Sequence, residues 1–290
     1  MFSYSEFINR NIGFVTTEEQ EKIRRAKIFI PGVGGMGGTA LECLARMGVE
    51  NFIIADIDTF EVSNLNRQIF SNLDLIGSQK AQAAKDQLLK INPNIKIEVM
   101  SGEWLEKINS VLEKVDFVIN GCDDVKATVL LMRAAKLKGK TVIDAFASTL
   151  PSAYVVNAKD PRPENTFSYP TRGLSADQIT PEIQKESAAC EMVYVLTHSS
   201  TIKHVILNYA AEMITGKRKR MSLAPMVWMT GLLMSYEALK LILEKPTLAS
   251  YKGVFLNPWS FKYEHPLWGP FATVKRVFVR YFLNRLAKSV

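Results

Sequence analysis

The sequence is poor in cysteine, and it has no apolar stretch long enough to cross a membrane. Its three cysteines, Cys43, Cys122 and Cys190, are widely spaced, and no Cys-x-x-Cys pair occurs. Such cysteines give no disulfide framework, which is typical of a reducing compartment. The longest apolar run, residues 224–234, falls short of the ~20 residues that a membrane span needs. Residues 1–25 do not resemble a signal peptide, so we expect a cytoplasmic protein.

The sequence also lacks internal repeats and long linkers rich in glycine, serine or proline. Its hydrophobic content of 47% can supply a large buried core. We therefore predict one main domain over residues 1–263 and a C-terminal appendage over residues 264–290. Residues 158–190 are rich in proline and polar side chains, and we expect them to be irregular and either functional or mobile.

Acidic residues are missing from residues 271–290, although this segment carries five basic ones. Residues 217–220, with the sequence KRKR, form a second basic cluster. The two clusters hold nine of the 36 basic residues, so the rest of the chain has 27 basic residues and 29 acidic ones. The net positive charge therefore belongs to two patches, and the body of the chain shows no general polyanion-binding character.

The acid-free segment has the pattern of an amphipathic helix. Apolar residues recur at helical spacing among its basic residues: Phe271, Val274, Val277, Phe278, Tyr281, Phe282 and Leu286. A basic amphipathic helix of this kind lies on an anionic membrane surface, which would make the protein peripheral there, or binds an acidic partner. The alternative is a helix that packs on the body of the protein with its basic side chains in solvent.

Glycine, in contrast, is concentrated in one short stretch. Residues 27–38 read KIFIPGVGGMGG, and Gly32, Gly34 and Gly37 fit the pattern G-x-G-x-x-G. The order of the segments predicts a β-α-β unit: an apolar run, this turn, an amphipathic segment and a second apolar run that ends at Asp56. The glycines permit a tight turn and a close approach of backbone N–H groups to phosphate oxygens. Asp56 is placed to accept hydrogen bonds from ribose hydroxyls.

A dense polar run follows the second predicted strand. Asp56 and Asp58 precede residues 61–68, which read EVSNLNRQ. A dehydrogenase has no need of these side chains, whereas a site that holds a triphosphate and a carboxylate together does. Lys80 falls in the first turn of a predicted helix, where a cation needs a compensating anion. Asp123 follows the fourth predicted strand, and the carboxyl ends of parallel strands form the ligand crevice of an open sheet.

These motifs, in this order, resemble the adenylation site of the ThiF/MoeB family, relatives of the ubiquitin-activating enzymes. The resemblance covers most of residues 5–245. It implies an α/β fold with a Rossmann-like, doubly wound mixed sheet and helices on both faces, parallel at first, with antiparallel strands added after the fifth strand. Family members usually carry two Cys-x-x-Cys pairs around a structural zinc. This chain lacks them, so we expect no zinc.

The resemblance also implies an activity. ATP and Mg²⁺ would be used to adenylate a substrate carboxylate, giving an acyl-adenylate and pyrophosphate. The carboxylate would be the C-terminus of a ubiquitin-like or sulfur-carrier protein, or that of a small peptide or another small molecule. The enzyme would be a homodimer, since Arg10 stands where family members have an arginine that reaches the γ-phosphate of the partner subunit's ATP.

By the same resemblance, two groups of residues form the site. The nucleotide-binding group is Gly32, Gly34, Gly35, Gly37, Asp56, Asp58 and Asn66. The catalytic group is Arg10, Asn64, Arg67, Gln68, Lys80 and Asp123. Asp123 would bind Mg²⁺, while Asp124 would cap the predicted helix 125–137, and these two roles can be exchanged.

In relatives, the segment that corresponds to residues 158–190 is a crossover loop that covers the substrate tail and can carry a catalytic cysteine. Cys190 is the candidate nucleophile in this chain. Its sequence neighbours include no cation that would lower the thiol pKa, which favours a structural role.

Three other interpretations stay open. An NAD-dependent oxidoreductase would share the glycines and Asp56, but it leaves Arg67, Lys80 and Asp123 unexplained. A non-catalytic scaffold could keep the same fold. A tRNA-modifying dehydratase relative would adenylate a nucleoside carboxylate and would use the basic patches to hold nucleic acid.

Overall fold

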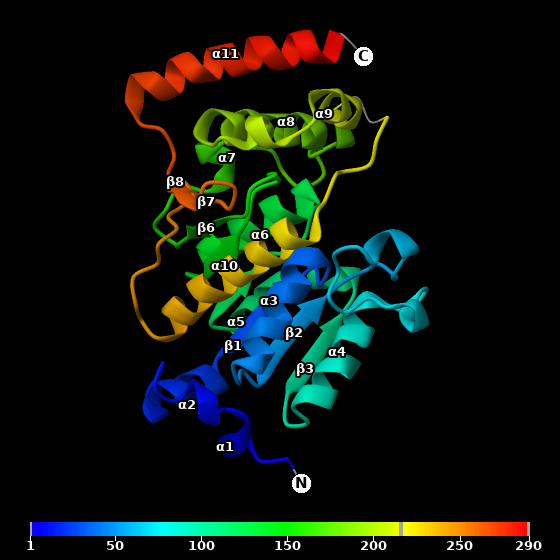
Figure 1. Ribbon diagram of the computed structural model, residues 1–290, viewed down its shortest axis with the longest axis vertical. Helices are drawn as coiled ribbons and strands as arrows, with labels where there is room; N and C mark the ends of the chain where they lie inside the picture. The colour runs from blue at the N-terminus through cyan, green and yellow to red at the C-terminus, as the bar shows by residue number, and fades with distance from the viewer. Residues whose placement is uncertain (1, 215–216, 289–290) are drawn as a thin grey trace.

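The computed structural model describes residues 2–214 and 217–288. At its centre lies one eight-stranded sheet, in the order β3-β2-β1-β4-β5-β6-β7-β8, with helices packed on its two faces (Figure 1). The first five strands pair in parallel, and β6, β7 and β8 join antiparallel. The predicted mixed sheet is therefore confirmed, including the change of direction after the fifth strand.

The parallel half consists of β-α units. Its strands are β1 (Lys27–Pro31), β2 (Asn51–Ala55), β3 (Lys96–Met100), β4 (Phe117–Ile119) and β5 (Thr141–Asp144). Its connecting helices are α3 (Gly35–Arg46), α4 (Lys80–Ile91), α5 (Ile108–Glu113) and α6 (Val125–Leu137). Short 3-10 helices lie between them: η2 (Val62–Asn64), η3 (Leu73–Leu75) and η4 (Gly102–Trp104).

Two hydrophobic cores lie on opposite faces of the sheet, because side chains alternate along each strand. Ile28 and Ile30 of β1 point into a core with α3, α4 and α10 (Ala224–Ile242). Phe29 points the other way, into a core with α5 and α6. Helices cover both faces, so the central strands read as nearly continuous apolar runs.

The N-terminal segment packs at the end of the sheet where the parallel strands begin. It contains α1 (Tyr4–Phe7), η1 (Asn9–Asn11) and α2 (Thr17–Arg25). Asn11 Nδ2 donates a hydrogen bond to the Met47 carbonyl at 3.1 Å, and the Tyr4 hydroxyl donates one to the Gly48 carbonyl at 2.8 Å. Both carbonyls follow the C-terminal end of α3, so η1 lies at the opposite end of α3 from the glycine-rich turn.

The second half adds three strands and several helices. They are β6 (Ser152–Val156), α7 (Pro163–Thr166), α8 (Pro181–His198), η5 (Thr201–His204), α9 (Leu207–Ile214), β7 (Val254–Asn257), β8 (Lys262–Glu264) and α11 (Gly269–Lys288).

The sequence had led us to expect that residues 158–190 are irregular, but only part of this segment is. They contain α7 and the N-terminal half of α8. Proline was read as a sign of a loop, but Pro181 stands in the first turn of α8, where its fixed φ angle suits a helix. The Thr180 side chain caps this helix by accepting from Ile183 N.

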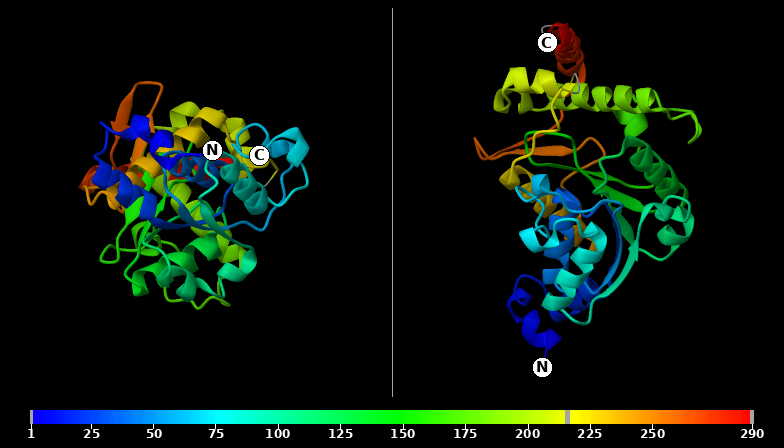
Figure 2. Two further views of the ribbon diagram at one scale, coloured as in Figure 1. Left: turned by 90° about the horizontal axis from the view of Figure 1, so that it is seen from below. Right: turned by 90° about the vertical axis from the view of Figure 1, so that its right-hand side faces the viewer.

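Within the predicted segment 264–290, residues Gly269–Lys288 form α11, which lies across α8 (Figures 1 and 2), whereas Glu264 belongs to β8. Residues 289 and 290 of the predicted segment lie outside the described residues. Ala272 and Val279 are buried, whereas the side chains on the other face are 60–76% exposed. These exposed side chains are Phe271, Val274, Val277, Phe278 and Tyr281. The helix therefore packs on the body, as in one of the two interpretations, but much of its apolar stripe is in solvent.

No helix within residues 2–214 and 217–288 combines the length and apolar character needed to span a membrane.

A buried polar network joins the carboxyl ends of β4 and β5. Asp144 is 5% exposed, and its Oδ2 accepts hydrogen bonds from Asn120 Nδ2 at 2.9 Å and from the Tyr154 hydroxyl at 2.7 Å. Its Oδ1 accepts from Ala145 N at 2.7 Å. Burial raises the pKa of Asp144 from 3.8 to about 7, although these three donors oppose the shift.

This pKa predicts a pH-dependent stability. Between pH 3.8 and about 7 the unfolded chain has lost the Asp144 proton while the folded protein still holds it. The contribution of Asp144 to the free energy of unfolding therefore falls as the pH rises through this window, and it is constant above it. We expect urea unfolding at a series of pH values to show this slope, and Asp144→Asn to remove it. Asp86→Asn, which changes an exposed carboxylate, should leave it; an unchanged slope in Asp144→Asn would contradict the assignment.

Candidate functional site

Three glycines bring β1, α3 and β4 into backbone contact. A Cβ atom on Gly32 would lie 2.4 Å from the carbonyl carbon of Gly121, and one on Gly37 would lie 1.9 Å from the Gly32 carbonyl oxygen. Gly32 also has a φ of +81°, which side chains rarely tolerate. No side chain fits at these positions without moving the backbone. The turn after β1 therefore lies directly against the segment that follows β4.

The N-terminus of α3 opens at this turn. The helix begins at Gly35 with Gly34 as its N-cap residue, and no side chain caps it. The first N–H groups of a helix have no partner within the helix, and the helix dipole adds positive potential there. Such an end suits the phosphate groups of a nucleotide, as the glycine pattern predicts.

Asp56 connects this turn to the loop after β2. Its Oδ2 accepts a hydrogen bond from Val33 N at 2.9 Å, and its Oδ1 accepts one from Asp58 N at 3.0 Å. Burial raises the pKa of this carboxyl, against the opposing effects of the Asp58 N–H and the Lys80 ammonium. The carboxyl group therefore positions the turn and reaches the predicted nucleotide crevice.

Lys80 has an anionic partner within the chain. Its Nζ lies 2.8 Å from Asp58 Oδ2, and Lys80 is 6% exposed whereas the Asp58 side chain is 61% exposed. The sequence had led us to expect a compensating anion for Lys80 at this helix N-terminus. Asp58 supplies that charge in the structure, and it holds the ammonium at the edge of the crevice.

The polar loop 61–68 is held largely by its own hydrogen bonds. Asn64 Oδ1 accepts from Glu61 N at 3.0 Å, which stabilises η2. Arg67 Nη1 donates to the Ser63 carbonyl and to Asn66 Oδ1, both at 2.9 Å. These contacts order the loop, so Asn64, Asn66 and Arg67 are positioned before any ligand binds.

Gln68 is the exception in this loop. It is 7% exposed, and its Oε1 is buried with no hydrogen-bond partner among the described residues. Its amide group lies 3.6 Å from the point that a Cβ on Gly34 would occupy. A buried polar atom without a partner is costly and uncommon, and this one lies beside the open N-terminus of α3. The arrangement fits a polar ligand at the turn.

The structure separates the roles of the two aspartates after β4. Asp124 is the N-cap of α6, since its Oδ1 accepts from Ala127 N at 2.6 Å. Asp123 is exposed, and its carboxylate forms no hydrogen bond or ion pair with any described residue. Asp56, Asp123 and Asp124 all raise the pKa of the Cys122 thiol, after the larger effect of burial, so these carboxylates lie near one another.

The donor set fits Mg²⁺ better than a metal held by the protein alone. Within the described part of the chain, no three His, Cys, Asp or Glu side chains form a metal-binding group. Mg²⁺ usually takes one or two carboxylates together with phosphate oxygens and water. Asp123 has no partner among the described residues and lies beside the glycine-rich turn, so it has the properties of such a ligand.

No local pattern in the sequence indicates that α10 contacts this cluster. A Cβ on Gly35 would lie 2.5 Å from Val227 Cγ1, so α10 packs directly on the start of α3. Trp228 Nε1 donates a hydrogen bond to the Arg67 carbonyl at 2.8 Å. Asn66 Nδ2 also donates to the Ser222 carbonyl, just before α10, at 3.2 Å. These contacts join segments more than a hundred residues apart, which local patterns do not reveal.

Arg10 and Cys190 are not part of this cluster. Arg10 is exposed on η1, at the far end of the 12-residue α3 and about 18 Å along the helix from Gly34. Cys190 lies on α8, and burial raises its thiol pKa. The sequence neighbours of Cys190 carry no cation, but Arg280 of α11 lies close enough in space to oppose that shift. The other predicted residues gather at the carboxyl edge of the parallel strands.

Comparison with known proteins finds sequence similarity to adenylyltransferases. It is 35% identical over 132 residues to the adenylyltransferase and sulfurtransferase UBA4 of Lodderomyces elongisporus, a match of 45% of this chain and 29% of that protein. It is 32% identical over 130 residues to the sulfur carrier protein adenylyltransferase of Thermus thermophilus, covering 44% of this chain and 48% of that protein. The match to the Haemophilus influenzae molybdopterin-synthase adenylyltransferase is 35% over 113 residues, or 39% of this chain and 46% of that one. The chain thus spans less than half the length of each of these relatives.

Solved structures share the fold over more of the chain. PaaA superposes with a TM-score of 0.62 at 21% identity, over 92% of this chain and 86% of PaaA. Escherichia coli MccB with ATP superposes with a TM-score of 0.61 at 18% identity, over 86% of this chain and 65% of MccB. At these identities the likeness establishes the architecture alone.

The family model described as "ThiF family" matches residues 8–270, which begin just before η1 and end in the first turn of α11. This match includes the glycine-rich turn, the polar loop and Asp123, and it agrees with the resemblance seen in the sequence motifs. The chain belongs to the ThiF family.

Proposed function

We propose that this chain uses ATP and Mg²⁺ to adenylate a carboxylate on a protein or peptide. One edge of the sheet gives this proposal its main support. The open N-terminus of α3 lies there with the unpartnered amide of Gln68 and the free carboxylate of Asp123. An NAD enzyme would use the turn and Asp56, but it gives no role to a free carboxylate beside the phosphates.

In the proposed reaction, the substrate carboxylate attacks the α-phosphorus of ATP and pyrophosphate leaves. The N–H groups at the start of α3 bind phosphate oxygens, and Asp56 binds the ribose. Arg67 and Lys80 offset the negative charge that develops, and Gln68 orients the reacting groups from its place at Gly34. Asn64 holds the polar loop in position through its bond to Glu61. Mg²⁺, bound by Asp123, would neutralise charge on the phosphates.

The proposed substrate class is a C-terminal carboxylate. The similar proteins named above include adenylyltransferases of a sulfur carrier protein and of molybdopterin synthase, and one solved structure holds MccB together with MccA. A carrier protein or a small peptide would therefore be the substrate here. A tRNA nucleoside carboxylate is the second candidate, for which the basic cluster 217–220 would bind the nucleic acid.

Thermal unfolding tests the nucleotide without knowledge of the substrate. A ligand that binds the folded state raises its stability, so ATP with Mg²⁺ should raise the Tm and NAD should not. Asp123→Ala should lose the Mg²⁺-dependent part of this shift. Asp124→Ala is the matched control: loss of the helix cap should cost about 1 kcal/mol of stability but leave the shift intact. A shift with NAD and none with ATP would reject the proposal.

We further propose a homodimer in which Arg10 completes the partner's site. Because Arg10 lies at the far end of α3, it cannot contact the phosphates bound by its own chain. The loop next to it is apolar and exposed: Ile12 is 41% and Phe14 is 92% exposed. An interface through this loop would bury both side chains and carry Arg10 to the second subunit.

Two substitutions should separate the interface from the phosphate contact. Phe14→Glu should shift the protein from dimer to monomer in sedimentation and weaken ATP binding with it, since a buried charge disrupts the interface. Arg10→Ala should leave the dimer intact and weaken ATP binding alone. If Phe14→Glu remains a dimer with full ATP affinity, Arg10 does not act across this interface.

For α11 we propose contact with an anionic membrane surface, which would make the protein peripheral there. Its outer face carries the exposed stripe of Phe271, Val274, Phe278 and Tyr281. Aromatic side chains near basic ones are typical of helices that lie in the membrane interface. The Lys217–Arg220 cluster, which is also basic, would add attraction to anionic lipids.

Vesicle binding tests this surface. Phe271→Ser with Phe278→Ser should reduce retention on vesicles that contain phosphatidylserine, because less apolar area enters the interface. Added salt should weaken retention of the unchanged protein, since it screens the lipid charge. Both proteins should keep the same Tm, because the two phenylalanines are exposed. Equal retention of the two proteins would exclude the membrane role of this face.

A further inference from the structure

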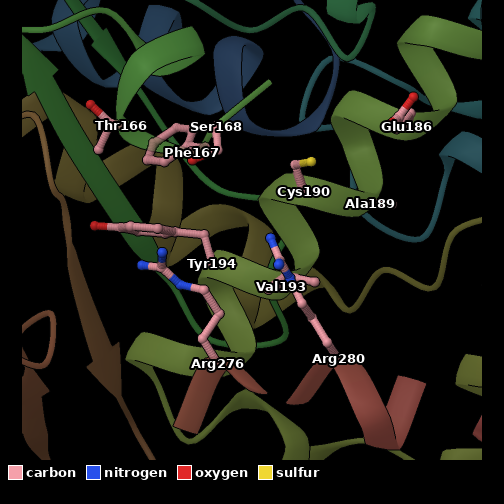
Figure 3. Close-up of a pocket in the computed structure, with 10 residues that line it drawn as sticks. All are labelled: Thr166, Phe167, Ser168, Glu186, Ala189, Cys190, Val193, Tyr194, Arg276 and Arg280. Carbon is pink, nitrogen blue, oxygen red and sulfur yellow. The ribbon is translucent and has the colours of Figure 1, made fainter. Parts of the chain in front are cut away.

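A second set of polar groups lies between α8 and α11, away from the glycine-rich turn. The two helices enclose a pocket of about 130 Å³. Phe167 and Tyr194 form apolar walls, and Cys190, Arg276 and Arg280 point polar groups into it (Figure 3). The site proposed above uses none of these side chains.

The basic residues of α11 that face α8 differ in their partners. Lys275 Nζ donates to the carbonyl of Ser199, the C-cap of α8, at 3.2 Å, and this contact suits a cation at a helix C-terminus. Arg276 and Arg280 form no hydrogen bond or ion pair with any other residue among 2–214 and 217–288. Figure 3 shows both guanidinium groups reaching from α11 toward α8.

Two guanidinium groups one helical turn apart repel each other. Arg276 is half-buried, Arg280 is exposed, and both line the pocket. Glu186 also lines it, but among the described residues it forms no ion pair with either arginine. The pocket therefore holds two cations and one carboxylate, and neither cation is paired with that carboxylate.

A neighbouring histidine lies close to the same positive charges. His198, one helical turn beyond Tyr194, is 6% exposed, and its Nδ1 has no hydrogen-bond partner in the described part of the chain. Burial lowers its pKa, and the charges of Arg276, Lys275 and Lys252 add to this effect, which brings the pKa to about 4. His198 is therefore neutral at physiological pH and adds no further charge to the pocket.

We propose that this pocket is a binding site for an oxyanion, either a carboxylate or a phosphate. Arg276 and Arg280 would each offer a planar pair of N–H donors to it, the geometry that suits both groups. The apolar part of the ligand would lie against Phe167 and Tyr194. The pocket size fits a single acidic side chain or an inorganic phosphate.

The position of α8 connects this pocket to the proposed reaction. Glu191, the residue after Cys190, accepts a hydrogen bond from Ala147 N at 3.0 Å, just beyond the carboxyl end of β5. A substrate whose C-terminus lies at the nucleotide site could place an acidic side chain in the pocket. In this form the inference rests on the proposed function, and it assigns α8 and α11 a role in substrate recognition. Free phosphate is the other source of the same chemistry.

Cys190 provides a direct test, because its thiol lines the pocket and is less buried than those of Cys43 and Cys122. The rate of alkylation of Cys190 by iodoacetamide is measured by mass spectrometry, with the other two cysteines as references. The probes are inorganic phosphate and acetyl-aspartate amide, each compared with potassium chloride of equal ionic strength. We expect at least one of them to slow alkylation several-fold in a saturable manner. Saturation by acetyl-aspartate amide identifies an acidic side chain as the ligand, and saturation by phosphate alone identifies phosphate.

Variants then assign the effect to the two arginines. Arg276→Gln with Arg280→Gln should abolish the protection, and Arg276→Lys with Arg280→Lys should weaken it, because an ammonium keeps the charge without the paired donors. Arg285→Gln is the matched control on the same helix; Arg285 packs on Tyr281 instead and should not affect protection. Equal protection in the double Gln variant, or no saturable protection of the unchanged protein, would overturn the proposal. Since this test needs no ATP, its failure is distinct from a failure of the nucleotide test.

Discussion

The contact between the backbones of Gly32, Gly37 and Gly121 is the constraint on which the candidate site depends. It leaves no room for a Cβ at any of the three positions. Because the chain can come this close, the turn after β1, the start of α3 and the end of β4 share one edge. Asp123, two residues beyond Gly121, lies near the glycine-rich turn for the same reason. A side chain here would separate the proposed phosphate site from the proposed metal ligand.

Most polar groups at this edge already have partners in the chain. Asp56 binds two backbone N–H groups, Asp58 pairs with Lys80, and Arg67 binds its own loop. These contacts fix the side chains before a ligand arrives, so less ordering remains to oppose binding. Among the described residues, Gln68 Oε1 and the Asp123 carboxylate have no such partner, and the proposed nucleotide and metal ion would bind them.

Local patterns predicted the first β-α-β unit of the parallel sheet, and the family resemblance supplied the candidate site residues. The β-α-β unit, the polar loop and the aspartates after β4 each follow from spacing within a few tens of residues. Prediction failed where packing between distant segments determines which residues are in contact. The contact of Val227 with Gly35 and the approach of Arg280 to Cys190 join parts of the chain that no local pattern connects. The helix at Pro181 was missed because proline signals both a loop and a helix start.

The C-terminal helix shows how packing selects between two faces of one sequence pattern. Its aromatic residues suggested the face that would be buried, yet α11 meets α8 through the smaller side chains of Ala272 and Val279. Small residues let two helices approach closely, and this approach turns Lys275, Arg276 and Arg280 toward α8. The larger apolar side chains are then left on the outside. The orientation of the helix about its axis therefore produces both surfaces: an outer aromatic stripe, and an inner pocket whose two arginines have no ion-pair partner among the described residues.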